Sequence, residues 1–119
     1  MAAPNIVNVS TITAKTAMQA VTASAASILS NSSSSGKVLK VNTIIISNVD
    51  STNSADITID IYRSTTTIRI VNTVTVPIKA SFTALDKSTV IYLEEGDSIR
   101  VTASAANRLE AIVSYEEIS

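Results

Sequence analysis

The sequence contains no histidine and no cysteine, and both absences narrow the chemistry available to it. Without histidine, the chain lacks the commonest general base, the usual catalytic triads and most zinc and iron sites. Without cysteine, it has no disulfide, no thiolate metal ligand and no cysteine nucleophile. Together these absences exclude most enzyme classes and leave stability to burial or assembly.

Glycine and aromatic residues are also scarce. Gly36 and Gly96 are the only glycines, too few for a glycine-rich phosphate loop. Sugar-cleaving sites pair two carboxylates across a cleft, but the adjacent Glu94 and Glu95 would point to opposite faces of a strand. The chain has no tryptophan and one phenylalanine, so it offers few flat platforms for a sugar. We therefore expect no enzymatic activity and no cofactor.

Charge is low and evenly spread. The formal net charge is −1, and the nine Lys and Arg residues form no basic stripe that could neutralise a row of phosphates. We expect no nucleic-acid partner. The opening MAAPNIVNVS lacks a basic start followed by an apolar core, and no run of 18 apolar residues occurs. These features predict neither a signal peptide nor a membrane span.

β-Branched residues are abundant instead, with 16 Ile, 12 Val and 15 Thr among 119 residues. Such side chains lose freedom in helices and pack well on pleated surfaces. A chain of this length buries about two thirds of the surface that it exposes when unfolded. We therefore predict one all-β domain over residues 1–119.

Alternating apolar and polar residues indicate several half-buried strands. In ADITIDIYR, Ile57, Ile59 and Ile61 share one face. The runs DSIRVTASA and RLEAIVSYE alternate in the same way and predict a C-terminal hairpin across the short connection AAN. Further strands are expected near residues 5–13, 38–49, 67–76 and 88–93. About seven or eight strands favour an antiparallel β-sandwich or jelly roll.

Two segments are harder to interpret. Residues 14–29 are rich in Ala, Ser and Thr, and AKTAMQAV would suit a short helix as well as a strand; we favour extended structure. SNSSSSG, residues 30–36, is interpreted as a polar surface loop.

The stretch LEEGDSIRV places Glu94, Glu95 and Asp97 around Gly96. A calcium site here, or at Asp50, Asn53 and Asp56, would need six or more converging oxygens, and neither spacing matches an EF-hand. Asn, Asp and Gly are also the residues that turns require. We therefore predict a turn in which Gly96 adopts a positive φ and Asp97 binds backbone amides, with the acids in water.

Two apolar segments are candidates for contact with other chains. In VNTIIISNV, whichever face the strand buries, the other still carries isoleucine, which either the chain itself or a neighbouring subunit must cover. Residues 1–9, with Pro4 opposing helix, form a possible N-terminal docking arm or a first strand with a frayed tip. The candidate interface residues are Pro4, Ile6, Val7, Val9, Ile44 and Ile46.

Three longer segments carry a family resemblance: SNVDSTNSADITIDIYR, TVPIKASFTALDKSTVIYLEEGDSIRV and LEAIVSYEEIS. The chain resembles small virion structural proteins of tailed bacteriophages, notably marine and cyanobacterial ones, from about Asn5 to Ser119. YLEEGDSIRVTAS leading into SYEEI is the most distinctive part. The resemblance implies a non-enzymatic β-sandwich used many times on the particle, without identifying its binding residues.

This resemblance implies a capsid decoration or cement protein that binds the outside of the major capsid lattice. A neck, collar or tail accessory protein is an alternative, and a glycan- or receptor-binding fibre module is another. The partners implied are the major capsid protein or other virion proteins, together with copies of the chain itself in a homotrimer. Assembly would take place in the host cytoplasm, and the protein would end on the virion.

Overall fold

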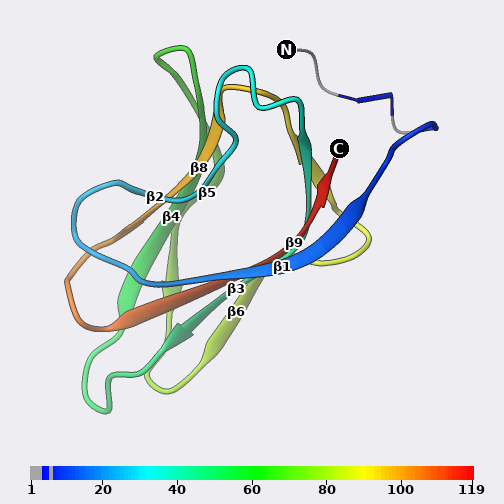
Figure 1. Ribbon diagram of the computed structural model, residues 1–119. Coiled ribbons are helices and arrows are strands. Elements are labelled where there is room, and N and C mark those ends of the chain that lie inside the picture. Colours follow the sequence, from blue (N-terminus) through cyan, green and yellow to red (C-terminus); the bar gives the residue numbers. More distant parts are fainter. Residues whose placement is uncertain (1–3, 6) are drawn as a thin grey trace.

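The computed structural model describes residues 4, 5 and 7–119, which form two antiparallel β-sheets packed face to face (Figure 1). The predicted all-β sandwich is confirmed, with nine strands instead of seven or eight. The strands are β1 (Ile12–Ala20), β2 (Ala26–Ser30), β3 (Val38–Asn48), β4 (Ala55–Arg63), β5 (Thr66–Val76), β6 (Ser81–Leu85), β7 (Ile91–Leu93), β8 (Asp97–Ala103) and β9 (Leu109–Ile118). Among the described residues, no helix is long and apolar enough to cross a membrane.

Sheet A has the strand order β1-β9-β3-β6, and β7 also pairs with β3; sheet B has the order β2-β8-β4-β5. The pairs β1–β9, β2–β8, β3–β6/β7 and β4–β5 are nested around the β4–β5 turn. This is a jelly-roll-like order, in which the chain crosses repeatedly from one sheet to the other. Most consecutive strands therefore lie in different layers.

The predicted C-terminal hairpin is wrong. β8 pairs with β2 and β4 in sheet B, whereas β9 pairs with β1 and β3 in sheet A. The segment 104–108 crosses between the layers, and Asn107 turns it with a φ of 65°. Alternating residues show that one face of a strand is buried. Because the strands of both sheets bury one face in the same core, this pattern does not identify the strand that lies beside it.

The N-terminal half also differs from the expected strand positions. The strand expected at residues 5–13 lies instead at Ile12–Ala20, and the segment 14–29 is extended as favoured, so AKTAMQAV is not a helix. β6 was not expected, and the strand near 88–93 is only Ile91–Leu93. The late start of β7 is explained by Asp86, because its carboxylate accepts hydrogen bonds from Ser88 and stabilises a turn ahead of this strand.

A β-bulge in β3 decides which isoleucines face the core. The register with β9 shifts between Val41 and Thr43, so one extra residue enters the strand there. Before the bulge the odd-numbered Leu39 and Val41 are buried; beyond it, the even-numbered Ile44 and Ile46 are buried. Ile45 therefore faces outward.

The core lies between the inner faces of the two sheets. Sheet A contributes Val41, Ile44, Ile46, Leu109 and Val113, and sheet B contributes Ile57, Ile59, Ile99 and Val101, each at most 1% exposed. Fully burying one such side chain stabilises the fold by about 1.5–3 kcal/mol. The shared core fixes the orientation of both outer faces.

Candidate assembly surface

The turn at residues 94–97 has the predicted local geometry. Gly96 has a φ of 90°, which an L side chain rarely adopts. The Asp97 amide donates to the Glu94 carbonyl at 3.0 Å, and the Glu94 amide donates to Asp97 Oδ2 at 2.9 Å. Gly96 and Asp97 lie in a turn that connects β7 in sheet A to β8 in sheet B.

The prediction that all three acids lie in water needs correction at Asp97, whose side chain is 1% exposed. Arg63 donates two hydrogen bonds to the Asp97 carboxylate, from Nε to Oδ1 at 2.6 Å and from Nη2 to Oδ2 at 2.7 Å. This hydrogen-bonded guanidinium holds the pKa of the Asp97 carboxyl below its usual value. Asp97 is therefore a buried structural anion that ties β4 to the turn.

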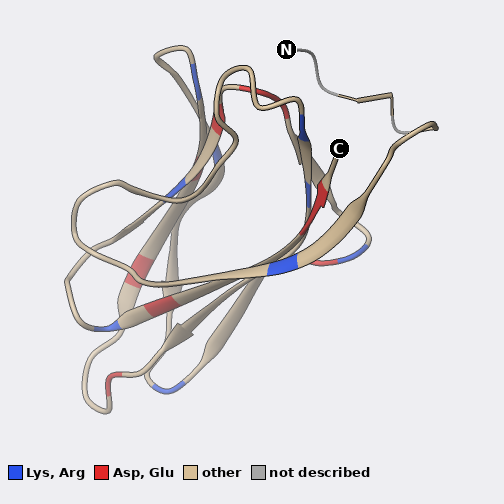
Figure 2. Cartoon of the chain, viewed as in Figure 1, with Lys and Arg blue, Asp and Glu red and all other residues tan. Residues whose placement is uncertain are grey.

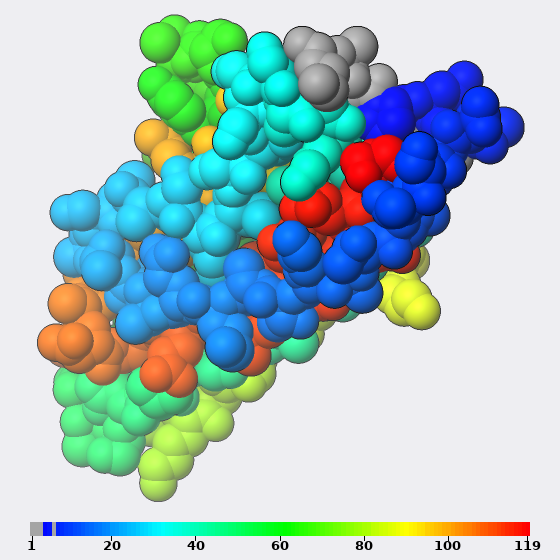
Figure 3. All heavy atoms as spheres, in the orientation of Figure 1, coloured from blue at the N-terminus to red at the C-terminus, as the bar shows by residue number. Residues whose placement is uncertain are grey.

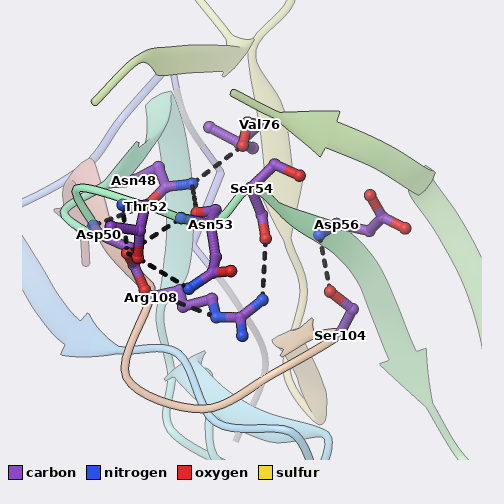
Figure 4. A network of polar contacts seen from close by, with 9 residues as sticks. All are labelled: Asn48, Asp50, Thr52, Asn53, Ser54, Asp56, Val76, Ser104 and Arg108. Atoms are coloured by element: carbon purple, nitrogen blue, oxygen red, sulfur yellow. Dashed lines mark hydrogen bonds and ion pairs between the residues drawn. The ribbon is translucent and has the colours of Figure 1, made fainter. Parts of the chain in front are cut away.

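The loop after β3 has its polar groups bonded within the protein (Figure 4). Asp50 Oδ1 accepts hydrogen bonds from the amides of Thr52 and Asn53 at 2.7 and 3.1 Å, which lower the pKa of Asp50. Arg108 donates from Nη1 to the Ser54 carbonyl at 3.0 Å. Within residues 4, 5 and 7–119, no group of three or more acidic, histidine or cysteine side chains could hold a metal ion.

Ile44 and Ile46 were assigned to a candidate interface, and the structure corrects that assignment. Both are 0% exposed within the sandwich, so neither has surface to offer a neighbouring chain. The β3 bulge is the physical reason, because it turns these two side chains inward. Ile45 is the member of the triplet that faces away from the core.

The proposed docking arm lies outside the sandwich where it is described. Val7 is 89% exposed, Pro4 and Val9 are partly exposed, and Ile6 lies outside the described residues. The segment forms its own turn, with the Asn8 amide donating to the Asn5 carbonyl at 2.9 Å. Among the described residues, the first backbone bond to the sandwich comes from the Ser10 amide to the Ser119 carbonyl, at 2.7 Å.

The outer face of sheet A is apolar and uncharged at its centre. One row across the sheet contains Met18, Ile112, Ile45 and Thr83. The next row contains Thr16, Ser114 and Thr43. Met18 is 76% exposed and Ile112 is 40% exposed. An apolar stretch on the outer face of a sheet is a feature of contact surfaces.

A shallow hollow of about 350 Å³ lies beside this row, lined by Met18, Gln19, Ala20, Ser47, Glu110, Ala111 and Ile112. Glu110 is its one ionisable side chain. Without a second titratable group, the hollow has no acid–base pair.

The sequence did not identify Met18 and Ile112 as surface candidates, and within the isoleucine triplet Ile44 and Ile46 were chosen instead of Ile45. A signal was present for Ile112, because placing Leu109, Ala111 and Val113 on one face of RLEAIVSYE puts Ile112 on the other. Met18 lies in the segment whose structure the sequence left open. Its place beside Ile112 depends on the pairing of β1 with β9, which no local pattern encodes.

Comparison with known proteins relates this chain to others by fold alone. No protein-family model and no curated protein matches it. A chain of the Bacillus endospore appendages, described as a novel family of disulfide-linked pili, superimposes with a TM-score of 0.53 at 17% identity, over 92% of this chain and 88% of that one. At this identity the similarity shows a shared fold.

Two structures of a pentameric capsid protein isolated from metagenomic phage sequences align with a TM-score of 0.42 at 15% identity. These alignments cover 87% of this chain and 60% or 61% of the capsid chains.

Proposed function

We propose that this chain is a non-enzymatic structural protein of a bacteriophage virion, and that it decorates the outside of the major capsid lattice. The family resemblance in SNVDSTNSADITIDIYR, YLEEGDSIRVTAS and SYEEI suggests the virion role. The uncharged outward-facing row of Met18, Ile112 and Ile45, in which Met18 and Ile112 are exposed and Ile45 is partly exposed, is the structural observation that carries the proposal.

The distribution of polar groups supports a role without chemistry. In the described part of the chain, every buried side-chain nitrogen or oxygen has a hydrogen-bond partner. The carboxylates of Asp50, Asp60 and Asp97 are held by amides or arginines, so they are committed to the fold. The surface side chains that are not bonded in this way remain available for contact with other proteins.

The appendage protein with a similar fold belongs to a family described as disulfide-linked pili. This chain contains no cysteine, so its own assembly cannot be linked by disulfides. The mechanism proposed is mechanical. Copies bury apolar and hydrogen-bonding surface across the seams between capsid proteins, and binding to the assembled lattice stabilises it by mass action.

A reconstruction of the particle tests the location. We expect many copies arranged on the capsid lattice, with the outer face of sheet A toward the capsid proteins. A low copy number in multiples of six or twelve along the tail axis would instead identify a neck, collar or tail accessory protein. Absence from the particle would refute the virion role altogether.

The docking arm has its own test. Deleting residues 2–8 is expected to lower the occupancy of particles by this protein, because Val7 and its neighbours extend away from the sandwich. A matched variant keeps the length of the arm but replaces residues 2–8 with Gly and Ser. If both variants coat particles as fully as the wild type, the arm does not dock.

Two remaining features of the proposal are measured on the purified protein. Light scattering tests the homotrimer implied by the family resemblance: we expect the mass of three chains, or of six where trimers also pair across a two-fold axis. A glycan array is expected to show no binding, because the chain has one phenylalanine and no tryptophan. Clear binding of a glycan at micromolar concentration would favour the fibre-module alternative.

A further inference from the structure

The four sheet edges of the sandwich differ in regularity. β2, β5 and β6 contain register shifts against their neighbours, and β7 is three residues long. β1 pairs with β9 over nine consecutive residues without a shift. Bulges and short strands are the usual means of preventing edge-to-edge pairing. Among the described strands, β1 is the long edge that lacks them.

β1 is also uncovered and nearly uncharged. It runs across the near face of the molecule in Figure 3, and its sequence ITAKTAMQA contains one charged residue, Lys15. Most of this strand is tan in Figure 2, where charged residues are blue or red. Lys15 Nζ lies 3.2 Å from Glu117 Oε2, so its charge has a partner within the same sheet. Because this one charge is already paired, little charge repulsion opposes a second strand beside β1.

The backbone bonds show which residues of β1 point to the free edge. Thr11 and Ser119 exchange two backbone bonds of 2.8 and 2.9 Å, and the Val21 amide donates to the Leu109 carbonyl at 2.9 Å. In an antiparallel ladder the bonded pairs alternate, so the odd-numbered residues of β1 bond to β9. The free amides and carbonyls belong to Ile12, Ala14, Thr16, Met18 and Ala20.

We propose that β1 is a two-fold interface that pairs antiparallel with β1 of a second copy of this chain, with Thr16 on the two-fold axis. This register overlaps all nine residues and joins the two copies of sheet A into one continuous sheet. It forms up to ten backbone hydrogen bonds, two for each of five pairs of even-numbered residues.

The side chains of ITAKTAMQA fit this register. Ile12 lies opposite Ala20 and Met18 opposite Ala14, so each large outer residue meets a small one. Lys15 lies opposite Ala17, whereas a shift that centres the pairing on Lys15 would bring two lysines face to face. Each Met18 row meets Ala14 of the other copy, so the two rows lie side by side on the outer face of the joined sheet, offset along the strands.

Single cysteines test the register directly, because the chain has none of its own. Across the two-fold axis the Cα atoms of the two Thr16 residues would lie about 5.5 Å apart, within the range of a disulfide. The Cα atoms of the two Ala14 residues would lie about 14 Å apart, outside it. In oxidised glutathione buffer, Thr16→Cys should cross-link about tenfold faster than Ala14→Cys.

A mixture of the Ala14→Cys and Met18→Cys proteins provides the matched control, because these positions face each other across the proposed interface. The mixed dimer should form as fast as the Thr16→Cys dimer. If Thr16→Cys and Ala14→Cys cross-link at equal rates, or if neither exceeds the rate in urea, the interface does not exist.

Proline separates pairing from folding. Thr16→Pro removes an amide that faces solvent, so the monomer should keep its unfolding midpoint. When the same proline is introduced into both the Ala14→Cys and the Met18→Cys proteins, the mixture of the two should no longer form the mixed cross-link. Ala17→Pro removes an amide bonded to β9 and should lower the midpoint. An undiminished cross-link in the Thr16→Pro background overturns the proposal. The inference concerns the isolated chain and holds wherever the protein acts.

Discussion

The two outer faces of the sandwich use their side chains in opposite ways. On sheet B, Asp60 is 0% exposed because Arg69 and Arg100 cover it, at 2.9 and 2.8 Å from its two oxygens. Arg100 also lies 4.4 Å from the centre of the Tyr62 ring. On sheet A, Met18 and Ile112 face outward with no polar cover.

The strands at the edges repeat this contrast. β5, at the edge of sheet B, has register shifts against β4 and a φ of 62° at Thr73, whereas β1, at the edge of sheet A, is regular throughout. On the outer face of sheet B, the charged side chains therefore bond to one another within the monomer, and the edge strand β5 is irregular. Sheet A leaves apolar surface and backbone groups available to another chain.

Asp60→Ala should cause the largest effect on the sheet B side. It removes a buried carboxylate that accepts charged hydrogen bonds from Arg69 and Arg100, and losing such bonds costs about 3 kcal/mol in the free energy of unfolding. Urea denaturation at constant m measures the loss. Glu110→Ala, on the exposed face of sheet A, is the matched control and should leave stability nearly unchanged.

Asp97→Asn should reduce stability at neutral pH and flatten its dependence on acid. Arg63 lowers the pKa of Asp97 in the folded protein, so the stabilisation is present above the unfolded pKa and is lost as pH falls through the folded value. Urea midpoints between about pH 2 and 7 measure this difference, since the unfolded pKa is about 3.9. Equal slopes for variant and wild type would show that Asp97 contributes no acid sensitivity.

Arg100→Lys should have a smaller effect, of about 1 kcal/mol in unfolding free energy. Lysine keeps the positive charge beside Asp60 but loses the planar group over Tyr62 and the bond to Thr67 Oγ1. Thermal unfolding compares it with Arg69→Lys, which has no ring beneath it in the described structure. A larger loss for Arg69→Lys would contradict the role assigned to the Tyr62 ring.

Ile112→Thr should have the smallest effect on folding, within about 0.5 kcal/mol, because the side chain faces solvent in the monomer. Its neighbour Val113 is 0% exposed, and Val113→Thr should cost about 1–3 kcal/mol by burying a hydroxyl without a partner. Denaturation of both variants measures the contrast. Equal losses would mean that the outer face of sheet A is already covered in the isolated protein.

Local sequence patterns predicted strands better than they predicted partners. ADITIDIYR and DSIRVTASA alternate because each strand has one buried face, and both are strands as expected. The weakly patterned segment 14–29 has few large apolar residues, so its strand was displaced in the prediction. Gly96 could be assigned to a turn because a positive φ is a local requirement.

The candidate surface was harder to predict because it depends on register. Ile44, Ile45 and Ile46 are equivalent in the sequence, and only the bulge after Val41 decides that two face the core. Likewise, the burial of Asp97 depends on Arg63, which lies 34 residues earlier in the chain.

The sequence by itself determined an all-β chain without histidine or cysteine, because composition limits both the backbone preferences and the available chemistry. The tertiary structure decided which strands are neighbours, which isoleucines remain outside and which edge stays open. These properties depend on pairing between residues far apart in the chain, and a period of two identifies a buried face without identifying the strand beside it.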